Sequence, residues 1–299
     1  MDDFSRALSP EVNGRRRVLC CHSARLSGRF PPNSLAAVDE CVSARVPRLE
    51  VDVRFMADDA MVIMHDSVLD HATTGLGRLD GLSRTDLAGV RYRGAEEHGI
   101  CFLEDVVARM RGSSTLLQVD LKALRPLTAA RRVSLINVLQ PLENRVIVGS
   151  QAHWNLRDLG ELSVAFDPTF QWHYSPERQA GLPRTLGVHG LWDDAPLATN
   201  PRTSAADYVE ARICDIRGLL PNAVEWMVDI QTALYLRTLG THLGDRLESE
   251  GCSLAVWTLH DEGADLLAGV LDDLFEVGAR TVITDAPLAA ASVLQSRFL

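Results

Sequence analysis

Two acidic residues alternate with apolar residues in one short segment. Leu49-Glu50-Val51-Asp52-Val53 places two carboxylates two residues apart. Side chains alternate along a β-strand, so Glu50 and Asp52 would share one face, about 7 Å apart. On an inward-facing strand their charges would repel unless a cation neutralised them, and a hard divalent cation prefers oxygen ligands of this kind. The alternative is an edge strand that shows a charged face to solvent, and this segment alone favours neither reading.

A third carboxylate ends a second apolar segment. The segment Thr115–Lys122 closes with Asp120 and Lys122, two residues apart. Asp120 could complete a metal site, and the ammonium of Lys122 could meet a phosphate oxygen as a point charge. The alternative is an ion pair between the two residues within the strand, which contributes little at a surface.

Histidines close two further apolar segments. His22 ends Val18–His22, and His65 ends Met61–His65. A single histidine at a strand end is usually structural, but two of them beside two carboxylate segments favour proton transfer, because imidazole exchanges protons near neutral pH. Asp66 follows His65. Asp66 could orient His65, although adjacent side chains on a strand point apart and would not readily pair.

Short segments rich in β-branched residues alternate with helical patterns along the chain. This alternation predicts parallel βαβ units, and a count of about eight strands favours a single (β/α)8 TIM barrel over a doubly wound sheet. No glycine-rich phosphate loop follows the first strand, which also disfavours the doubly wound sheet. The predicted strands are Val18–His22, Arg48–Phe55, Met61–His65, Thr115–Leu121, Arg145–Gly149, Ser163–Phe166, Ala223–Ile230, Ser253–Leu259 and Thr281–Thr284. The predicted helices are Ser34–Ala44, Leu103–Met110, Ala129–Leu139, Thr203–Cys214, Gln231–Glu250, Ala264–Val277 and Ala289–Phe298, the last with Asp285 and Pro287 as start signals. Because the carboxyl ends of barrel strands form the active face, this fold would gather the acidic residues and histidines.

The two remaining parts of the chain carry less information. Residues 1–17 form a polar N-terminal extension in which Arg15–Arg17 is read as a solvated flank, and residues 18–299 form the barrel. The stretch Phe170–Pro201 is predicted as long loops with one uncertain strand. Within it, three residues could wall the substrate pocket or pack the loop onto the barrel: Trp172, His173 and Tyr174.

Composition limits the classes of partner. A net charge of −10 argues against nucleic-acid binding and against docking on anionic membranes. No stretch approaches the roughly 18 uncharged residues of a membrane helix, and the N-terminus does not read as a secretory signal. The six cysteines have no metal-ligand spacing and are read as reduced thiols. We therefore expect a cytoplasmic protein with no stable membrane association. The sequence does not indicate the oligomeric state.

Taken in chain order, these motifs resemble the glycerophosphodiester phosphodiesterase family. His22 stands where that family has His-Arg-Gly, Leu49–Val53 is similar to its Glu-x-Asp-Val strand, and His65-Asp66 follows after 12 residues, as in the family. Val119–Lys122 resembles its Glu-Ile-Lys strand. Three weaker matches are Pro31–Ala37 to Pro-Glu-Asn-Thr-Leu-Ala-Ala, Val256–Thr258 to Trp-Thr, and Gly278 with Ile283–Pro287 to Gly…Thr-Asp-x-Pro. The resemblance spans roughly residues 18–290.

The resemblance implies a TIM barrel that hydrolyses a small phosphodiester to a phosphomonoester and an alcohol. It implies one divalent cation, Mg²⁺ or Ca²⁺, held by Glu50, Asp52 and Asp120. It also implies that His22 and His65 act as base and acid, in an order that the sequence does not fix. The substrate's own hydroxyl could be the attacking group, which would give a cyclic phosphate first.

Departures from the family pattern concern substrate recognition. Ser23 replaces the arginine that holds the phosphate, at a cost of about 1.5–3 kcal/mol for a charged hydrogen bond. Arg25 could reach the same space, or Lys122 and the cation could carry the charge alone. Pro32 replaces a glutamate, Asp120 stands for the third glutamate, and His260 follows Trp257-Thr258-Leu259 where the family commonly has asparagine. The residues expected to bind substrate or phosphate are Lys122, Arg25, Trp257 and His260.

Two alternatives to the family reaction stay open. The altered residues are compatible with a specialised phosphoester lyase, cyclase or hydrolase of secondary metabolism that acts on a non-glycerol substrate. The Asp-Leu-Lys sequence at Asp120 also resembles the corresponding strand of the sphingomyelinase D group, which forms cyclic phosphates. The chain lacks that group's cysteine-bearing loop. The other alternative is a non-catalytic barrel that binds metal or phosphate, which the retained His22 and His65 argue against.

Overall fold

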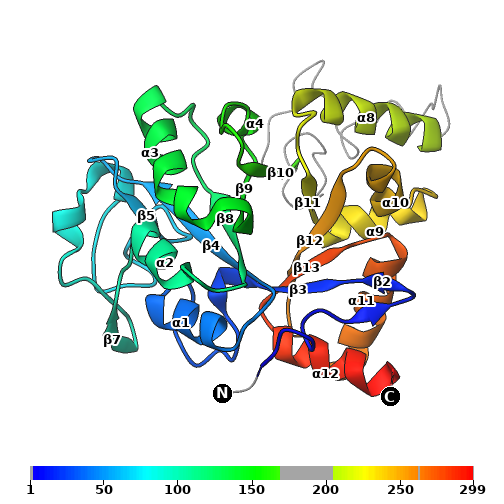
Figure 1. The fold of residues 1–299 in the computed structure, drawn as a ribbon, viewed down its shortest axis with the longest axis horizontal. Helices are drawn as coiled ribbons and strands as arrows, with labels where there is room; N and C mark the ends of the chain where they lie inside the picture. The colour runs from blue at the N-terminus through cyan, green and yellow to red at the C-terminus, as the bar shows by residue number, and fades with distance from the viewer. Residues whose placement is uncertain (1–2, 169–204, 262, 299) are drawn as a thin grey trace.

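A closed ring of parallel strands forms the centre of the molecule (Figure 1). The computed structural model describes residues 3–168, 205–261 and 263–298, so the predicted loops of Phe170–Pro201, with Trp172, His173 and Tyr174, lie outside the described residues. Within that part of the chain, β3 pairs with β4, the ring continues in chain order, and it closes where β13, its last strand, pairs with β3. Its eight strands are β3 (Val18–Cys21), β4 (Arg48–Phe55), β8 (Leu116–Leu121), β9 (Val146–Ser150), β10 (Ser163–Phe166), β11 (Glu225–Asp229), β12 (Ser253–Leu259) and β13 (Thr281–Thr284). The predicted (β/α)8 barrel is confirmed.

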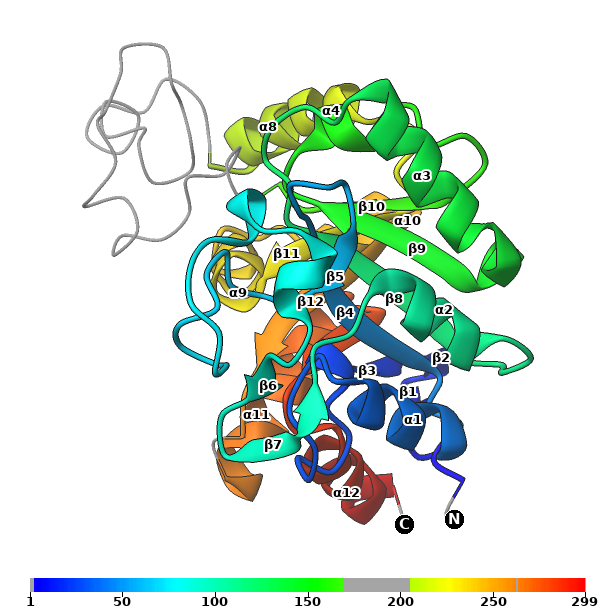
Figure 2. The same cartoon turned by 90° about the vertical axis from the view of Figure 1, so that its left-hand side faces the viewer.

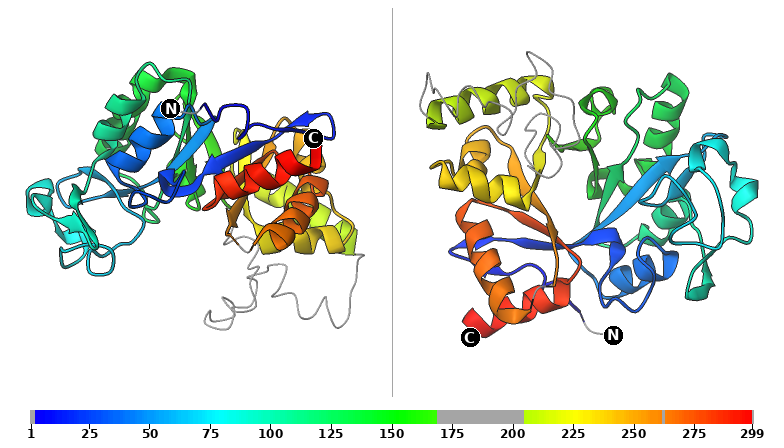
Figure 3. Two further views of the ribbon diagram at one scale, coloured as in Figure 1. Left: turned by 90° about the horizontal axis from the view of Figure 1, so that it is seen from below. Right: turned by 180° about the vertical axis from the view of Figure 1, so that it is seen from behind.

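Helices cover the outside of the ring and start where the sequence supplies caps. Ser34, Thr128 and Asp229 each accept a hydrogen bond from a backbone N–H in the first turn of the helix that follows. The helices are α1 (Leu35–Ser43), α2 (Leu103–Met110), α3 (Ala129–Leu139), α4 (His153–Leu156), α8 (Ala205–Leu219), α9 (Ile230–Thr238), α10 (Leu243–Glu248), α11 (Ala264–Glu276) and α12 (Pro287–Phe298). The last two pack side by side near the C-terminus (Figure 3, orange and red).

Two predicted elements differ from the structure. The helix predicted over Gln231–Glu250 is two helices, α9 and α10, because Gly240 between them has a φ of +84° that ends the first. The strand predicted over Met61–His65 ends at Ile63 as β5 (Met61–Ile63), and it pairs antiparallel with β4 outside the ring. Both errors lie at element ends, where local backbone geometry overrides the hydrophobic pattern.

Strand alternation divides the core into two layers. Outward-facing residues such as Leu49, Val51 and Val53 are buried against the helices. Inward-facing residues fill the barrel, among them Cys20, Ile147, Ala165, Met227, Ala255 and Ile283. At the amino-terminal end of the strands, the guanidinium of Arg48 bonds with both carboxylate oxygens of Glu225, at 2.9 and 2.5 Å, and with Gln118 Oε1. The inward face of β4 therefore reads Arg48, Glu50, Asp52 and Arg54 from the amino-terminal end to the mouth.

A long crossover, residues 56–115, connects β4 to β8 and packs beside them (Figure 2, cyan). It holds β5, 3₁₀ turns at Leu79–Gly81 and Arg84–Leu87, the hairpin of β6 (Arg91–Tyr92) and β7 (Ala95–Gly99), and finally α2. Some of its apolar residues form a hydrophobic cluster separate from the main core, consisting of Met56, Val62, Met64, Leu69, Leu79, Leu87 and Val90. Other buried apolar residues of the crossover belong to the main core: Met61, Ile63, Cys101, Leu103, Val106, Val107 and Met110. The crossover therefore packs partly on itself and partly on the barrel.

The N-terminal segment packs at the amino-terminal end of the barrel strands, beside the starts of β3 and β13. It forms the hairpin of β1 (Glu11–Val12) and β2 (Arg15–Arg16). Arg15 lies 2.7 Å from Asp245, but Arg17 is buried and its Nη1 donates to the carbonyl of Ala279 at 2.7 Å, so the predicted solvated flank is wrong for Arg17. Among the described residues, no helix is both long enough and apolar enough to cross a bilayer.

Candidate active site

Three carboxylates meet at the carboxyl ends of β4 and β8. Asp52 and Asp120 lie side by side in the parallel register of these strands, and Glu50 lies two residues before Asp52 on the same face. One oxygen from each of the three residues lies within 4.8 Å of the others. Glu50 and Asp52 are buried, and Glu50 Oε1 has no hydrogen-bond donor among the described residues. A buried carboxylate oxygen without a donor fits a cation ligand, so this group could hold a metal ion.

The electrostatics of the cluster also favour an added cation. Burial, followed by the charge of Asp52, raises the pKa of Glu50 well above its ordinary value. Burial acts in the same direction on Asp52, but the charges of Lys122 and His65 outweigh it and lower the pKa of Asp52. The cluster therefore cannot keep all its carboxylates ionised without more positive charge than the side chains supply.

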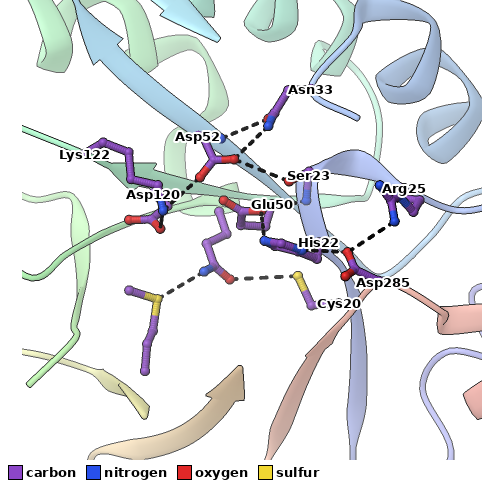
Figure 4. Close-up of polar contacts among 12 residues, drawn as sticks. Cys20, His22, Ser23, Arg25, Asn33, Glu50, Asp52, Asp120, Lys122 and Asp285 are labelled. Atoms are coloured by element: carbon purple, nitrogen blue, oxygen red, sulfur yellow. Dashed lines mark hydrogen bonds and ion pairs between the residues drawn. The ribbon is translucent and has the colours of Figure 1, made fainter. Parts of the chain in front are cut away.

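Two side chains that the sequence analysis did not assign to the site hold the carboxylates in place (Figure 4). The amide of Asn33 donates to Asp52 Oδ2 at 2.7 Å, and its Oδ1 accepts from the backbone N–H of Asp52 at 3.1 Å. The backbone N–H of Ser23 donates to Glu50 Oε2 at 2.7 Å, and its hydroxyl donates to Asp52 Oδ2 at 3.3 Å. Asn33 was read only as part of a helix start, and its position in that motif was the available signal.

Lys122 bridges the two aspartates. Its Nζ lies 2.9 Å from Asp52 Oδ1 and 2.5 Å from Asp120 Oδ2. Burial lowers the pKa of Lys122, but the neighbouring carboxylates outweigh it and raise this pKa above its ordinary value. The ion pair between Asp120 and Lys122 that was considered from sequence is present, but it lies inside the barrel mouth and involves Asp52 as well.

His22 is oriented by Asp285, which follows the last barrel strand. His22 Nδ1 lies 2.8 Å from Asp285 Oδ1, and His22 Nε2 lies 3.9 Å from Glu50 Oε2, so Nε2 faces the carboxylate cluster. Burial opposes the charged imidazole, but the hydrogen bond to Asp285 and the charge of Glu50 raise the pKa of His22 to about 9. Burial raises the pKa of Asp285, but the hydrogen bond from His22 outweighs it and lowers this pKa to about 2. The sequence analysis read Asp285 as a helix start and as part of the Gly…Thr-Asp-x-Pro match, without a role at the site.

His65 lies in the turn after β5, on the crossover. Its Nδ1 lies 2.9 Å from Asp66 Oδ1, so Asp66 does contact His65, although strand alternation had disfavoured this pairing. The reason is that β5 ends at Ile63, and side chains do not alternate in the turn that follows. His65 is exposed, whereas His22 is largely enclosed.

One cavity of about 270 Å³ connects these groups. Six of the residues predicted from sequence line it: His22, Glu50, His65, Asp120, Lys122 and Trp257. Asp52 lies buried behind them. The cavity is also lined by Arg54, Gln118, Leu121, Leu124, Gln151, Asp167, Met227, Thr258 and Ile283. The structure therefore brings the predicted acidic residues and both histidines around a single space.

Two residues predicted to bind substrate do not line this cavity. His260 is exposed, and its Nδ1 lies 2.7 Å from the second oxygen of Asp285. Arg25 Nη1 lies 3.7 Å from the first oxygen of Asp285, and Arg25 lines a neighbouring cavity that His65 also touches. Asp285 thus links three basic side chains.

Comparison with known proteins decides the family. Residues 26–289 match the model of the "Glycerophosphoryl diester phosphodiesterase family". The chain belongs to this family. A glycerophosphodiester phosphodiesterase of Caldanaerobacter subterraneus is 27% identical over 146 residues, which are 46% of this chain and 59% of that protein. The chain spans less than two thirds of the length of the curated relatives that it matches first.

Solved structures share the fold. A glycerophosphoryl diester phosphodiesterase structure from Agrobacterium tumefaciens has a TM-score of 0.65 at 17% identity, covering 96% of this chain and 100% of the other. An Oleispira antarctica phosphodiesterase, solved with the product sn-glycerol-3-phosphate, has a TM-score of 0.58 at 14% identity and covers 93% and 96%. In this chain Ser23 donates hydrogen bonds to the carboxylates of Glu50 and Asp52 and, as a neutral side chain, brings no positive charge.

Proposed function

We propose that this protein is a metal-dependent phosphodiesterase that hydrolyses a small glycerophosphodiester. The observation that carries the proposal is the position of His22 Nε2, 3.9 Å from an oxygen of Glu50, within one cavity that Asp120, Lys122 and His65 also line. Family membership supports the reaction class. The product bound to the Oleispira antarctica phosphodiesterase supports a phosphomonoester product of glycerol.

Glu50, Asp52 and Asp120 would hold one divalent cation, Mg²⁺ or Ca²⁺. When bound, it would supply positive charge to the phosphoryl oxygens as negative charge develops in the transition state. Asn33 and Ser23 would keep the carboxylates oriented, because each donates to carboxylate oxygens of this cluster. The buried Oε1 of Glu50, which accepts no hydrogen bond within the described part of the chain, would be a ligand of this cation.

His22 would act as the base. Donation of its Nδ1–H to Asp285 leaves Nε2 to accept the proton of the attacking hydroxyl, which belongs to water or to the substrate. Glu50 and Asp52 are among the charges that raise the pKa of His22. Neutralising them would lower this pKa toward its ordinary value and so leave Nε2 unprotonated near neutral pH.

His65 would act as the acid. As the bond between phosphorus and the leaving oxygen breaks, His65 would give its proton to that oxygen, and the alcohol would depart. Its exposed position on the crossover suits this role, since the alcohol must leave toward solvent. Asp66 would stabilise the protonated imidazole through its contact with Nδ1.

The test is hydrolysis of a panel of glycerophosphodiesters with Mg²⁺ or Ca²⁺, followed by phosphorus NMR, with Glu50→Gln as the matched inactive variant. A phosphomonoester that forms with either cation and not with chelator is expected. A cyclic phosphate that accumulates would show attack by the substrate's own hydroxyl. Metal binding by calorimetry without cleavage of any ester would instead support a binding barrel.

A second candidate is a phosphoester enzyme for a non-glycerol substrate. It is favoured by Ser23, which adds no charge, and by Arg25, which faces Asp285 and lines the neighbouring cavity. The same panel should then include bulkier phosphoesters. Brisk turnover of glycerophosphocholine would reject this candidate.

A further inference from the structure

Arg54 is a basic residue of the cavity that the sequence analysis did not assign. It follows Asp52 by two residues on β4, so its side chain lies on the same inward face and closer to the barrel mouth. It lines the cavity together with Glu50, His65, Asp120 and Lys122. A partly buried arginine at this place adds positive charge to a cavity that carboxylates also line.

The hydrogen bonds of Arg54 leave most of its donors available. Its Nε donates to the carbonyl of His65 at 2.7 Å. In residues 3–168, 205–261 and 263–298, no carboxylate lies within ion-pair distance of Arg54, although nearby Arg78 pairs with Asp80 at 3.0 Å. A guanidinium has five N–H donors, and the two Nη atoms form a planar fork that fits two oxygens of a phosphate.

The other basic side chains near the cavity are engaged elsewhere. Lys122 is fixed between Asp52 and Asp120. Arg25 faces Asp285 and lines the neighbouring cavity. An anionic substrate entering a space lined by several carboxylates needs a positive charge that these carboxylates do not already neutralise.

We propose that Arg54 binds the non-bridging phosphate oxygens of the substrate through its two Nη atoms. This inference rests on the proposed phosphodiesterase function, whose reacting phosphate it places at the mouth of the cavity. The bond from Nε to the carbonyl of His65 couples phosphate binding to the position of the acid.

The experiment compares Arg54→Gln and Arg54→Lys with the wild type and with Arg78→Gln, a matched nearby arginine with its own carboxylate. Binding of inorganic phosphate to the Mg²⁺-loaded protein is measured by calorimetry, and KM and kcat are measured on the best glycerophosphodiester. Arg54→Gln is expected to weaken phosphate binding and raise KM by about 10- to 100-fold. Arg54→Lys should recover part of the loss, and Arg78→Gln should match the wild type.

Mg²⁺ affinity and the melting temperature of Arg54→Gln, measured alongside, separate a structural role from phosphate binding. A loss of kcat with unchanged phosphate affinity would mean that Arg54 only holds His65, and it would overturn the inference. Unchanged phosphate affinity and unchanged kinetics would overturn it too, while leaving the phosphodiesterase function intact. If the wild type cleaves no ester, the phosphate titration still tests Arg54 independently.

Discussion

His22 Nδ1 lies 2.8 Å from a carboxylate oxygen of Asp285, and this contact raises the pKa of the imidazole against the effect of burial. Because that hydrogen bond contributes strongly to the raised pKa of His22, Asp285→Asn should bring this pKa below about 9. The same change should reduce turnover by about 10²-fold, since Nε2 loses its fixed orientation. An NMR titration of the His22 imidazole in chelator, beside a turnover assay, checks both. Asp261→Asn is the control, and an unshifted His22 pKa in Asp285→Asn would contradict the argument.

Turnover should require both His22 and His65. His22→Ala and His65→Ala should each cut turnover by about 100-fold or more, because each removes one proton transfer. His71→Ala, an exposed histidine of the same crossover, should retain wild-type turnover. Near-normal rates for both of the first two variants would remove them from the mechanism.

The substitution Glu50→Gln should change the thermal stability of the metal-free and the metal-bound protein in opposite directions. In chelator at a pH above about 8, where Glu50 is ionised, Glu50→Gln should raise the melting temperature slightly, since it removes a buried charge that repels Asp52. With Mg²⁺ or Ca²⁺ at about 100 times the dissociation constant, the wild type should gain about 2.7 kcal/mol in its free energy of unfolding, and the variant should gain little. Thermal melts with and without cation measure this reversal. Equal stabilisation of both proteins would place the cation elsewhere.

The contact between His22 and Asp285 should stabilise the chelated protein only within a limited pH range. The pKa of His22 rises from 6.5 to about 9 on folding, so its contribution is complete below about 6.5 and lost as pH rises through about 9. The pKa of Asp285 falls from 3.8 to about 2, so its contribution is present above about 3.8 and lost as pH falls through about 2. Urea denaturation of the wild type and His22→Gln should therefore differ most between about pH 4 and 6.5. A difference that grows above pH 9 would have the wrong sign.

Arg48 and Glu225 should stabilise the fold as a pair inside the barrel. Arg48→Met leaves Glu225 buried without its partner and should cost about 3–5 kcal/mol in the free energy of unfolding. The double variant Arg48→Met with Glu225→Leu should recover most of that loss, because no uncompensated charge is left. Urea denaturation of the single and double variants gives the comparison. A double variant as unstable as Arg48→Met would show that packing, and not charge, accounts for the cost.

Strand alternation made the acidic cluster predictable from sequence. Glu50 and Asp52 had to share one face of a strand, and the parallel barrel then brought Asp120 beside Asp52. The same alternation places Arg54 on that face, although the reading stopped at the acidic residues. The shared face of Glu50 and Asp52 could therefore be read from one strand alone.

Contacts between distant segments were not predictable in this way. Asp285 and Asn33 each stand next to a helix start, where a polar residue has a local explanation that hides a role at the site. Only ring closure, which brings β13 beside β3, shows that Asp285 meets His22. The pairing of His65 with Asp66 was disfavoured from the sequence because it depends on where β5 ends.

The separate hydrophobic cluster of the crossover has a consequence for how this protein can diverge. His22 and the carboxylates lie on the barrel, whereas His65 lies on the crossover, part of which packs in a hydrophobic cluster of its own. Substitutions within that cluster can change the wall of the cavity while the barrel keeps its packing. The crossover is thus the natural segment to exchange between family members when a different alcohol is to be accepted. The barrel residues would then keep the same reaction while the accepted alcohol changes.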